Sequence, residues 1–406
     1  MSKPRKPKKE ITVAEQEVYR RFMDWLKQTW YGLPEADEME PFIMALYTPE
    51  EASSLTGMPF GGKNLEELAQ MKQMDPAQLS QQLDALAKKG FVFRVVKGDT
   101  VRYSLNDAFF TQRTTFWPGR KDEISKTLAP LANQYYYHGF FDPYAEVNTK
   151  GLRALPIKGT IEDTREILPY EEVTKVLDSQ DYFTVTTCPC KHRKNLDPDF
   201  PNCKYPTEVC LHFGRLGHYI VDNGLGREIT RREAEDILRQ CAEVGLVHAI
   251  SNQQEGADTI CNCCKCCCIW FEAFYKLKHS MSLSPSNYRV HTNSQTCIGC
   301  GLCVKRCPME ALHLEDSPEA KGRVTVVASE KEGKKELKNK IGKVSVVNPD
   351  LCIGCGVCAY KCQTKSLVLE HREVTHHPPL TSRDYVMQFI AERQVALGQL
   401  GQDKRK

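Results

Sequence analysis

No cysteine precedes Cys188, although the chain of 406 residues contains 19 of them. The first half therefore serves some purpose other than metal binding. No apolar run reaches the ~18 residues that span a bilayer, and the formal net charge of +3 does not by itself indicate any partner. Disulfides are rare in the cytoplasm, so this many cysteines in a chain without export features indicates metal binding. These features predict a cytoplasmic protein without a membrane span.

Motifs for common catalytic sites are also missing. The chain has no P-loop, no Gly-rich nucleotide loop and no motif that suggests a Ser–His–Asp arrangement, and GLGRE at 224–228 is too short for a dinucleotide fingerprint. The N-terminal MSKPRKPKKE has no apolar segment behind it, so it is predicted to be a disordered basic arm over 1–11 rather than a secretory signal. We therefore expect neither a nucleotide site nor an independent catalytic site on this chain.

Residues 40–115 have the pattern of three helices and a hairpin. A capping box of Thr48 and Glu51 begins the first helix, NLEELAQMKQM forms the second, and the third begins at Pro76. FVFRVVKGDTVRYSLN then predicts two strands that turn at Gly98. This order resembles the winged-helix fold of transcription regulators, which implies either DNA binding or protein interaction.

The candidate recognition helix favours protein interaction. PAQLSQQLDALAKK offers only Lys88 and Lys89, both at its end, and has no arginine to read guanine. A second segment, LRQCAEVGLV at 238–247, repeats the Leu, Ala, Gly and Val spacing of LDALAKKGFV at 83–92. In this alignment Cys241 takes an inward position, so we expect a buried apolar residue there rather than a ligand.

Aromatic and amphipathic segments predict packing surfaces elsewhere. Residues 116–185 are rich in aromatic side chains, which we expect to pack in the core or in an interface. TSRDYVMQFIAERQVALG predicts an amphipathic helix that docks on this chain or on a partner. Its apolar side carries Val386, Phe389, Ile390 and Leu397.

The same cysteine motif occurs twice near the C-terminus, as CIGCGLCVKRC from Cys297 and CIGCGVCAYKC from Cys352. Each is CxxCxxCxxxC, the ligand run of a bacterial-type [4Fe–4S] cluster. Glycines inside each run let the backbone wrap close to inorganic sulfur. The repeat continues as PMEALHLE and QTKSLVLE, which predict a short helix and then a strand each time.

These residues resemble the two-cluster bacterial ferredoxins over about 80 of the 406 residues. The resemblance implies a pseudo-twofold domain in which the fourth ligands are exchanged between two [4Fe–4S] clusters. The implied ligands are Cys297, Cys300, Cys303 and Cys362 for one cluster, and Cys352, Cys355, Cys358 and Cys307 for the other. Gln363 replaces the second proline of the family pattern but removes no ligand. The excess sequence between the motifs predicts a charged hairpin.

A second cysteine-rich region precedes the ferredoxin-like part. Such dense thiolates repel one another unless they share a cation. The candidate ligands are Cys188, Cys190, Cys203 and Cys210, followed by Cys261, Cys263, Cys264, Cys266, Cys267 and Cys268. This arrangement is similar to one in ferredoxin-like proteins of strict anaerobes, a resemblance that carries no activity with it.

Three interpretations of this region compete: one or two further [4Fe–4S] clusters, structural zinc, and redox-active thiols. Iron is favoured because the ferredoxin-like part already requires iron–sulfur assembly. Cys188, Cys190, Cys203 and Cys210 would complete one cluster, although the two groups of cysteines can also mix. We expect His192 and His212 to donate hydrogen bonds to sulfur rather than ligate. Lys191, Arg193 and Lys265 are expected to offset the negative charge.

The sequence as a whole predicts an α+β protein. Its expected parts are a winged-helix domain at 12–115, a cysteine-rich α/β domain at 116–290, a pseudo-twofold ferredoxin-like domain at 291–372 with an inserted hairpin, and a docking helix with its tail at 373–406. The leading hypothesis is an electron-transfer subunit that serves a partner oxidoreductase. A redox-sensing DNA-binding regulator and a reductase with an open central cluster are the alternatives.

Overall fold

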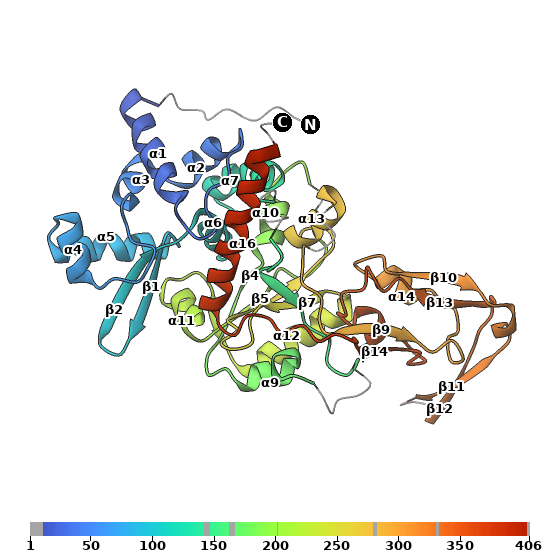
Figure 1. Cartoon of the computed structure of the whole chain (residues 1–406). Helices are drawn as coiled ribbons and strands as arrows, with labels where there is room; N and C mark the ends of the chain where they lie inside the picture. Colours follow the sequence, from blue (N-terminus) through green and yellow to red (C-terminus); the bar gives the residue numbers. More distant parts are fainter. Residues whose placement is uncertain are drawn as a thin grey trace.

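The computed structural model describes residues 11–141, 147–161, 167–200, 202–278, 282–329 and 333–403, with the backbone alone at 97 and 395–403. Figure 1 shows a helical N-terminal part at one end, the two cysteine repeats with their strands at the other end, and a sheet between them. Nearly all of the predicted basic arm, residues 1–10, lies outside the described residues.

The N-terminal part contains the predicted three helices and hairpin. Thr48 and Glu51 form the expected capping box, and β1 pairs with β2 in antiparallel fashion around Gly98. The order of elements agrees with a winged helix, and membership of that family stays a prediction. The elements are α1 (Val13–Leu26), α2 (Met39–Leu46), α3 (Pro49–Leu55), α4 (Leu65–Lys72), α5 (Pro76–Lys88), β1 (Val92–Lys97) and β2 (Thr100–Leu105).

The central part is built on a six-stranded sheet in the order β3-β7-β8-β5-β4-β6. All the strand pairs recorded in this sheet are antiparallel, so the expected α/β arrangement is wrong in this respect. Strands β7 and β8 are joined by the short segment 252–258, as in a hairpin, and the helical segments between the other successive strands do not serve as crossovers to a parallel neighbour. The strands are β3 (Leu152–Ala154), β4 (Phe183–Thr187), β5 (Glu208–Phe213), β6 (Arg227–Ile229), β7 (Val247–Ser251) and β8 (Thr259–Cys263).

Helices cover this sheet and connect it to the N-terminal part. Helix α10 packs against both α6 and α7, and α7 also packs against α2. The helices are α6 (Ala108–Phe116), α7 (Glu123–Tyr135), α9 (Val173–Asp178), α10 (Pro189–Leu196), α11 (Gly214–Asp222), α12 (Arg231–Val244) and α13 (Ile269–Leu277), and the short turns are η1 (Tyr136–Phe140) and η2 (Pro169–Glu171).

The C-terminal repeat folds with twofold internal symmetry. Strand β9 before the first cysteine run pairs with β14 after the second, and β10 after the first pairs with β13 before the second. The predicted hairpin is present as β11 and β12. The elements are β9 (Tyr288–Thr292), α14 (Leu302–Arg306), β10 (Leu312–Asp316), η3 (Pro318–Ala320), β11 (Val324–Ser329), β12 (Gly333–Lys338), β13 (Lys343–Val347), α15 (Val357–Tyr360) and β14 (Leu367–His371).

The C-terminal helix α16 (Ser382–Asp403) docks on this chain, and Figure 1 shows it crossing toward the N-terminal helices. Phe389 is buried against Trp30 and Tyr31, with ring centroids 5.4 and 5.7 Å away. The side chain of Leu397, predicted on the same face, lies outside the described residues. None of the helices in the described ranges combines the length and apolar character needed to cross a bilayer.

One hydrophobic core runs from the N-terminal helices into the cysteine-rich region. The predicted aromatic packing is confirmed, because Tyr135, Tyr136, Phe140 and Phe141 are all buried in this core. Cys241 is fully buried in a second core cluster, as expected. Burial raises the pKa of its thiol to about 12.

Candidate metal centres

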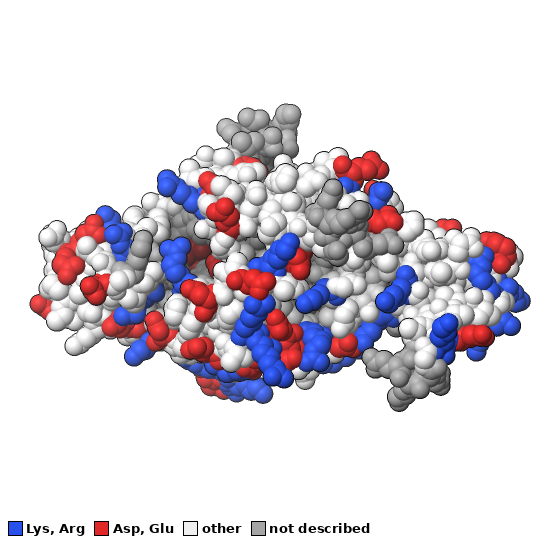
Figure 2. Space-filling model, turned by 90° about the horizontal axis from the view of Figure 1, so that it is seen from below, with Lys and Arg blue, Asp and Glu red and all other residues white. Residues whose placement is uncertain are grey.

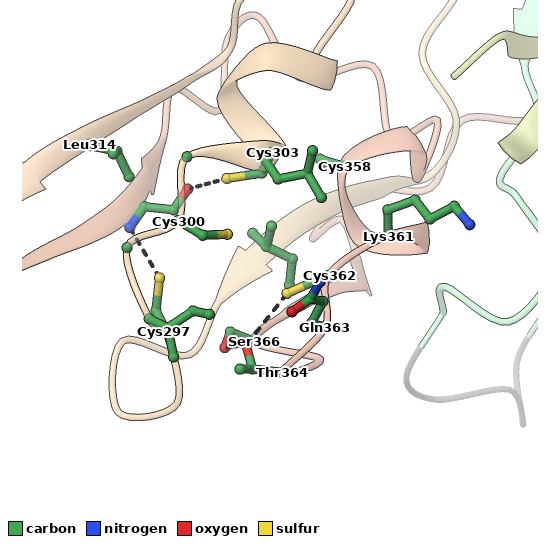
Figure 3. Close-up of a pocket in the computed structure, with 16 residues that line it drawn as sticks. Cys297, Cys300, Cys303, Leu314, Cys358, Lys361, Cys362, Gln363, Thr364 and Ser366 are labelled. Carbon is green, nitrogen blue, oxygen red and sulfur yellow. Dashed lines mark hydrogen bonds between the residues drawn. The ribbon is translucent and has the colours of Figure 1, made fainter. Parts of the chain in front are cut away.

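Two cavities in the ferredoxin-like part each gather four of the predicted ligands. Site I is lined by Cys297, Cys300, Cys303 and Cys362, which come from the loop and helix of the first repeat and from the end of the second cysteine run (Figure 3). Site II is lined by Cys307, Cys352, Cys355 and Cys358. Cys358 borders both cavities, so the two sites are neighbours. The chain thus brings together the same two sets that the resemblance implies, with the fourth cysteines exchanged.

Backbone donors reach equivalent sulfurs at the two sites. The N–H of Ser345 donates to Sγ of Cys297, and the N–H of Val290 donates to Sγ of Cys352, both at 3.5 Å. Val290 lies on β9, which precedes the first cysteine run in the sequence, and Ser345 lies on β13, which precedes the second, so each strand donates to the opposite run. Such donors stabilise a thiolate more than a thiol, which fits metal-bound sulfur.

Glycines make the close approach of these strands possible. Gly299 and Gly354 have φ values of 65° and 68°. A Cβ atom at these positions would lie 2.4 Å from the carbonyl oxygen of Lys343 and 2.2 Å from that of Tyr288. Because the contacts are with backbone oxygens, a larger residue cannot be accommodated by moving a side chain.

Site I and site II differ in exposure. Cys300 at site I is exposed, whereas Cys355 and Cys358 at site II are buried. The segment 157–161 covers site II, since the N–H of Ile157 donates to the carbonyl of Cys355. Burial raises the pKa of Cys355, so its ionisation requires a cation in the cavity.

Comparison with known proteins agrees with this geometry. Residues 296–366 match the family of 4Fe-4S dicluster domains. Ferredoxin-3 of Rhodobacter capsulatus is 31% identical to the chain over 80 residues, which are 19% of this chain and 76% of that protein. The putative ferredoxin-3 of Sinorhizobium fredii (strain NBRC 101917 / NGR234) is 37% identical over 78 residues, 18% of this chain and 70% of that protein.

The chain belongs to the ferredoxin family. The family relationship rests on its C-terminal ferredoxin domain, which is of the type that binds two [4Fe–4S] clusters and serves electron transfer. No solved structure matches the chain. The family match covers residues 296–366, so the cysteine-rich central part lies outside it.

A third cavity, the inner pocket, lies in the central part next to the ferredoxin domain. Arg113, Lys191, Asn262 and Trp270 are among the residues that line it, and Cys264 also borders it. The remaining cysteines of the inner pocket are Cys188, Cys190, Cys210, Cys261, Cys263 and Cys268.

The strand β8 supplies two cysteines of the inner pocket and anchors them. Cys261 and Cys263 are two residues apart, so they lie on one face of the strand, and Asn262 points to the other face. Asn262 donates to the carbonyl of Val209 at 2.7 Å and accepts from Nδ1 of His248 at 2.6 Å. These contacts to β5 and β7 fix the face of β8 that carries the sulfurs.

Two helix N-termini are directed at the inner pocket. Cys188 is the N-cap of α10, and Cys268 is the N-cap of α13. Backbone N–H groups of Lys191 and Trp270, in the first turns of these helices, interact with the two sulfurs. A helix N-terminus carries partial positive charge, so both helices favour an anionic group in the pocket.

Buried cations surround the inner pocket. Although burial lowers the pKa of the Lys191 ammonium, the nearby cysteines, Cys188 first among them, outweigh that effect and raise it. Burial also lowers the pKa of the Arg113 guanidinium. The sulfurs of Cys261, Cys190 and Cys210 outweigh this effect, so the pKa is raised overall. The Lys191 cation was expected from sequence. Arg113 was missed, because it comes from helix α6 far upstream and no local signal marks it.

Arg193 provides a test of whether an anionic group fits the inner pocket. Its side chain is buried and lies over the ring of Tyr136, 4.1 Å from the centroid. Within the described residues, its Nε and Nη2 have no hydrogen-bond partner. It acts on Cys190, whose pKa is lowered first by contact with the Cys188 thiol and further by Arg193. A buried guanidinium with two unpartnered nitrogens near Cys190 fits a thiolate-bound cluster better than neutral thiols.

Four further cysteines form a second group, the four-thiol site, at the turn between β8 and α13. Their sulfurs all lie within 4.8 Å of one another, and the members are Cys203, Cys264, Cys266 and Cys267. The run CNCCKCCC is therefore divided between two sites. Three of the set Cys188, Cys190, Cys203 and Cys210 line the inner pocket and Cys203 lies with the four-thiol site, so each site combines cysteines of both groups, which was the other arrangement considered.

Within the part of the chain that the structure describes, neither His192 nor His212 donates a hydrogen bond to sulfur, contrary to expectation. Nε2 of His192 donates to the carbonyl of Arg120 at 2.6 Å. Both ring nitrogens of His212 lie 3.1 Å from threonine hydroxyls, those of Thr186 and Thr259. Burial lowers the pKa of His212 to about 3, so the ring is neutral. Both histidines are structural residues of the central part.

Proposed function

We propose that the chain transfers electrons between a partner oxidoreductase and an iron–sulfur cluster in the inner pocket, through the two clusters of the ferredoxin domain. Each [4Fe–4S] cluster supplies a one-electron carrier. The cysteines of sites I and II hold two such carriers, and the six cysteines of the inner pocket hold at least one more. The order from solvent inward is site I, site II and the inner pocket.

The observation that carries this proposal is that site II and the inner pocket belong to one connected hydrophobic core. Cys355 of site II lies in the same hydrophobic core cluster as Cys261, Cys263 and Cys268 of the inner pocket. Met309, in the turn after Cys307, belongs to that cluster as well. Buried side chains of one connected core therefore link the two places.

Polar contacts fix the same junction. Lys265, in the loop that carries the central cysteines, forms an ion pair with Glu310 of the ferredoxin domain. The ring of Tyr275 lies 4.3 Å from the Lys265 ammonium, and its hydroxyl donates to the carbonyl of Pro308. Lys265 thus joins the two cysteine-bearing parts, a role different from the charge compensation expected of it.

Site I is the end that a redox partner can reach. Cys300 is exposed, and the neighbouring Leu302 is 37% exposed. The hairpin of β11 and β12 beside it presents Val324 and Val326, which are 47% and 57% exposed. Apolar side chains on a charged hairpin suit a transient protein contact.

The N-terminal part fits a scaffold better than a DNA reader. Lys89, one of two basic residues on the candidate recognition helix, pairs with Glu51. On the face shown in Figure 2, basic and acidic side chains are interspersed. Neither feature provides the basic surface that phosphate contacts require.

Iron and sulfide content of the anaerobically purified full chain tests the proposal. Two cubanes account for about eight irons, and a further cubane adds about four. Cys263→Ser, which removes an inner-pocket thiol, should lower the iron content and leave the reduced EPR signals of the ferredoxin domain intact. Cys241→Ala is the matched control, because that buried cysteine lies outside every thiol group described above.

Two results would count against a central carrier. Wild-type chain with only about eight irons would leave the inner pocket without a cluster. Equal iron content in the wild type and in a variant with Cys190, Cys261 and Cys263 all replaced by serine, which leaves three of the six thiols, would show that the inner pocket does not hold iron. Either result would reduce the function to that of a two-cluster ferredoxin fused to a scaffold.

A further inference from the structure

We propose that the four-thiol site binds a single zinc ion and takes no part in holding a cluster. The sulfur of Cys203 lies 3.9 Å from that of Cys264 and 3.7 Å from that of Cys266. Cys266 lies 3.6 Å from Cys264 and 3.5 Å from Cys267, again between sulfurs. These separations are the observation on which the proposal stands.

The separations fit one tetrahedral ion. Four thiolates about 2.3 Å from a zinc ion are about 3.8 Å from one another. In a cubane each thiolate binds a different iron, so the cysteine sulfurs are roughly 6 Å apart. The sulfurs here are 3.5–3.9 Å apart where they are in contact, and all lie within 4.8 Å. The space between them holds one ion and excludes four irons with their sulfides.

The four ligands come from two segments that the ion would join. Cys264, Cys266 and Cys267 lie in the turn between β8 and α13. Cys203 comes from the loop after α10, where its N–H donates to Oδ1 of Asn195 at 2.7 Å. Adjacent cysteines readily share one ion, whereas they strain the wider geometry of a cubane. The result is a closed set of four protein ligands, which is typical of structural zinc.

Burial and charge also fit a structural ion. Cys264 and Cys267 are 2% and 1% exposed, while Cys266 faces solvent. The buried ammonium of Lys191 donates to the carbonyl of Pro206 at 2.8 Å and to that of Asn262 at 3.2 Å. One cation therefore lies between the two segments that carry the thiolates. Four thiolates and one divalent zinc ion carry a net negative charge, and the Lys191 ammonium offsets part of it.

Zinc is favoured over a single iron by general affinity. Divalent zinc binds a given thiolate site more tightly than iron(II) does. Bound there, zinc would hold the turn whose two ends, Cys263 and Cys268, line the inner pocket. The four-thiol site would thus shape the cluster site without exchanging electrons. This inference does not depend on the electron-transfer proposal, because it concerns different cysteines.

Metal analysis and zinc K-edge X-ray absorption on the anaerobically purified full chain test the inference. We expect one zinc ion per chain, with four sulfur neighbours at about 2.3 Å. Cys203→Ser and Cys266→Ser should each lower the zinc content at least tenfold and leave the EPR signals of the ferredoxin domain unchanged. Cys241→Ala, the matched control, should keep the zinc.

Several outcomes would overturn the inference. These are a wild-type chain without zinc, zinc with nitrogen or oxygen neighbours, a single iron with four sulfurs in place of zinc, or loss of about four irons from Cys203→Ser. Where the serine variants do not fold, the absorption spectrum of the wild type decides by itself. Cobalt substitution offers a second readout, since the thiolate-to-cobalt charge-transfer bands gain intensity with each thiolate ligand and are strongest for four.

Discussion

Replacing Gly299 with alanine should weaken the hold of the ferredoxin domain on its clusters far more than the same change at Gly301. Both glycines flank Cys300 and both have positive φ, 65° and 70°. A Cβ at 299 would lie 2.4 Å from the carbonyl oxygen of Lys343, whereas a Cβ at 301 would meet Leu314 at an ordinary 3.5 Å. The two variants therefore share the backbone strain and differ in the clash.

The size of the difference follows from these two terms. Alanine in the left-handed region costs about 1–2 kcal/mol, which both variants incur. Forcing an atom into a packed site costs about 1–3 kcal/mol more, which only Gly299→Ala incurs. The difference corresponds to about one to two powers of ten in the equilibrium between closed and locally opened domain. Strand β13 must shift to relieve the clash, and with it the N–H donor of Ser345 to Cys297.

The rate at which cluster absorbance disappears in a fixed denaturant with an iron chelator measures this difference. Cluster loss is irreversible, so a rate is the appropriate quantity. If loss proceeds from a rapidly formed open state, its rate follows the equilibrium between the two states. We expect Gly299→Ala to lose its clusters about 10–100 times faster than Gly301→Ala. Equal rates would refute the assigned packing of β13 against the cysteine loop.

Three further perturbations test the central part. Arg113→Gln removes a cation beside the inner pocket and should lower the reduction potential of its centre by on the order of 60 mV in an EPR-monitored redox titration. Glu272→Ala removes the anionic partner of the buried Lys194 ammonium, which lies 3.0 Å from that carboxylate and keeps its hydrogen bond to the Tyr137 hydroxyl, and should cost about 3–5 kcal/mol in thermal unfolding. Acid should also destabilise the fold, because burial lowers the pKa of His212 to about 3 and that of His248 to about 4. Below the usual pKa of about 6.5 the unfolded chain therefore binds more protons than the folded chain. The free energy of unfolding, which is at its full value above pH ~6.5, should fall by about 2 kcal/mol per ring at pH 5.

Each of these predictions has a control on this chain. The potentials of the ferredoxin clusters should not change in Arg113→Gln, and a uniform shift of all centres would contradict the placement of that cation. Glu310→Ala removes an exposed ion-pair partner and should cost less than about 1 kcal/mol. The acid sensitivity should persist in a variant of exposed His291 and should diminish in His212→Gln. An unchanged profile in His212→Gln would count against that ring as a cause.

The ferredoxin ligands could be grouped from sequence because their spacing is a local property. Three cysteines in seven residues, from Cys297 to Cys303, stay close together whatever the rest of the chain does. The exchange of Cys307 and Cys362 required only the family resemblance, and the cavities agree with it. The hairpin turn at Gly98 and the capping boxes were likewise predictable, because each involves residues within a few positions of one another.

The division of the central cysteines could not be predicted in this way. It depends on where β8 ends, at Cys263, and where α13 begins, after Cys268. It depends as well on Cys203, which reaches the turn from a segment about 60 residues upstream. Such long-range placement leaves no periodic signal in the sequence. For the same reason Arg113, which comes from a helix without any cysteine, was not foreseen as a neighbour of the sulfurs.

The electron path itself is tested most directly by rapid-freeze EPR after mixing the full chain with a small reduced ferredoxin, a donor too large to enter the buried inner pocket. The account predicts that the central signal appears together with those of the ferredoxin domain in the wild type. In Cys355→Ser, which perturbs site II, the central centre should still be present by iron analysis and become reduced at least tenfold more slowly. Equal rates of central reduction in the two proteins would contradict a path through site II.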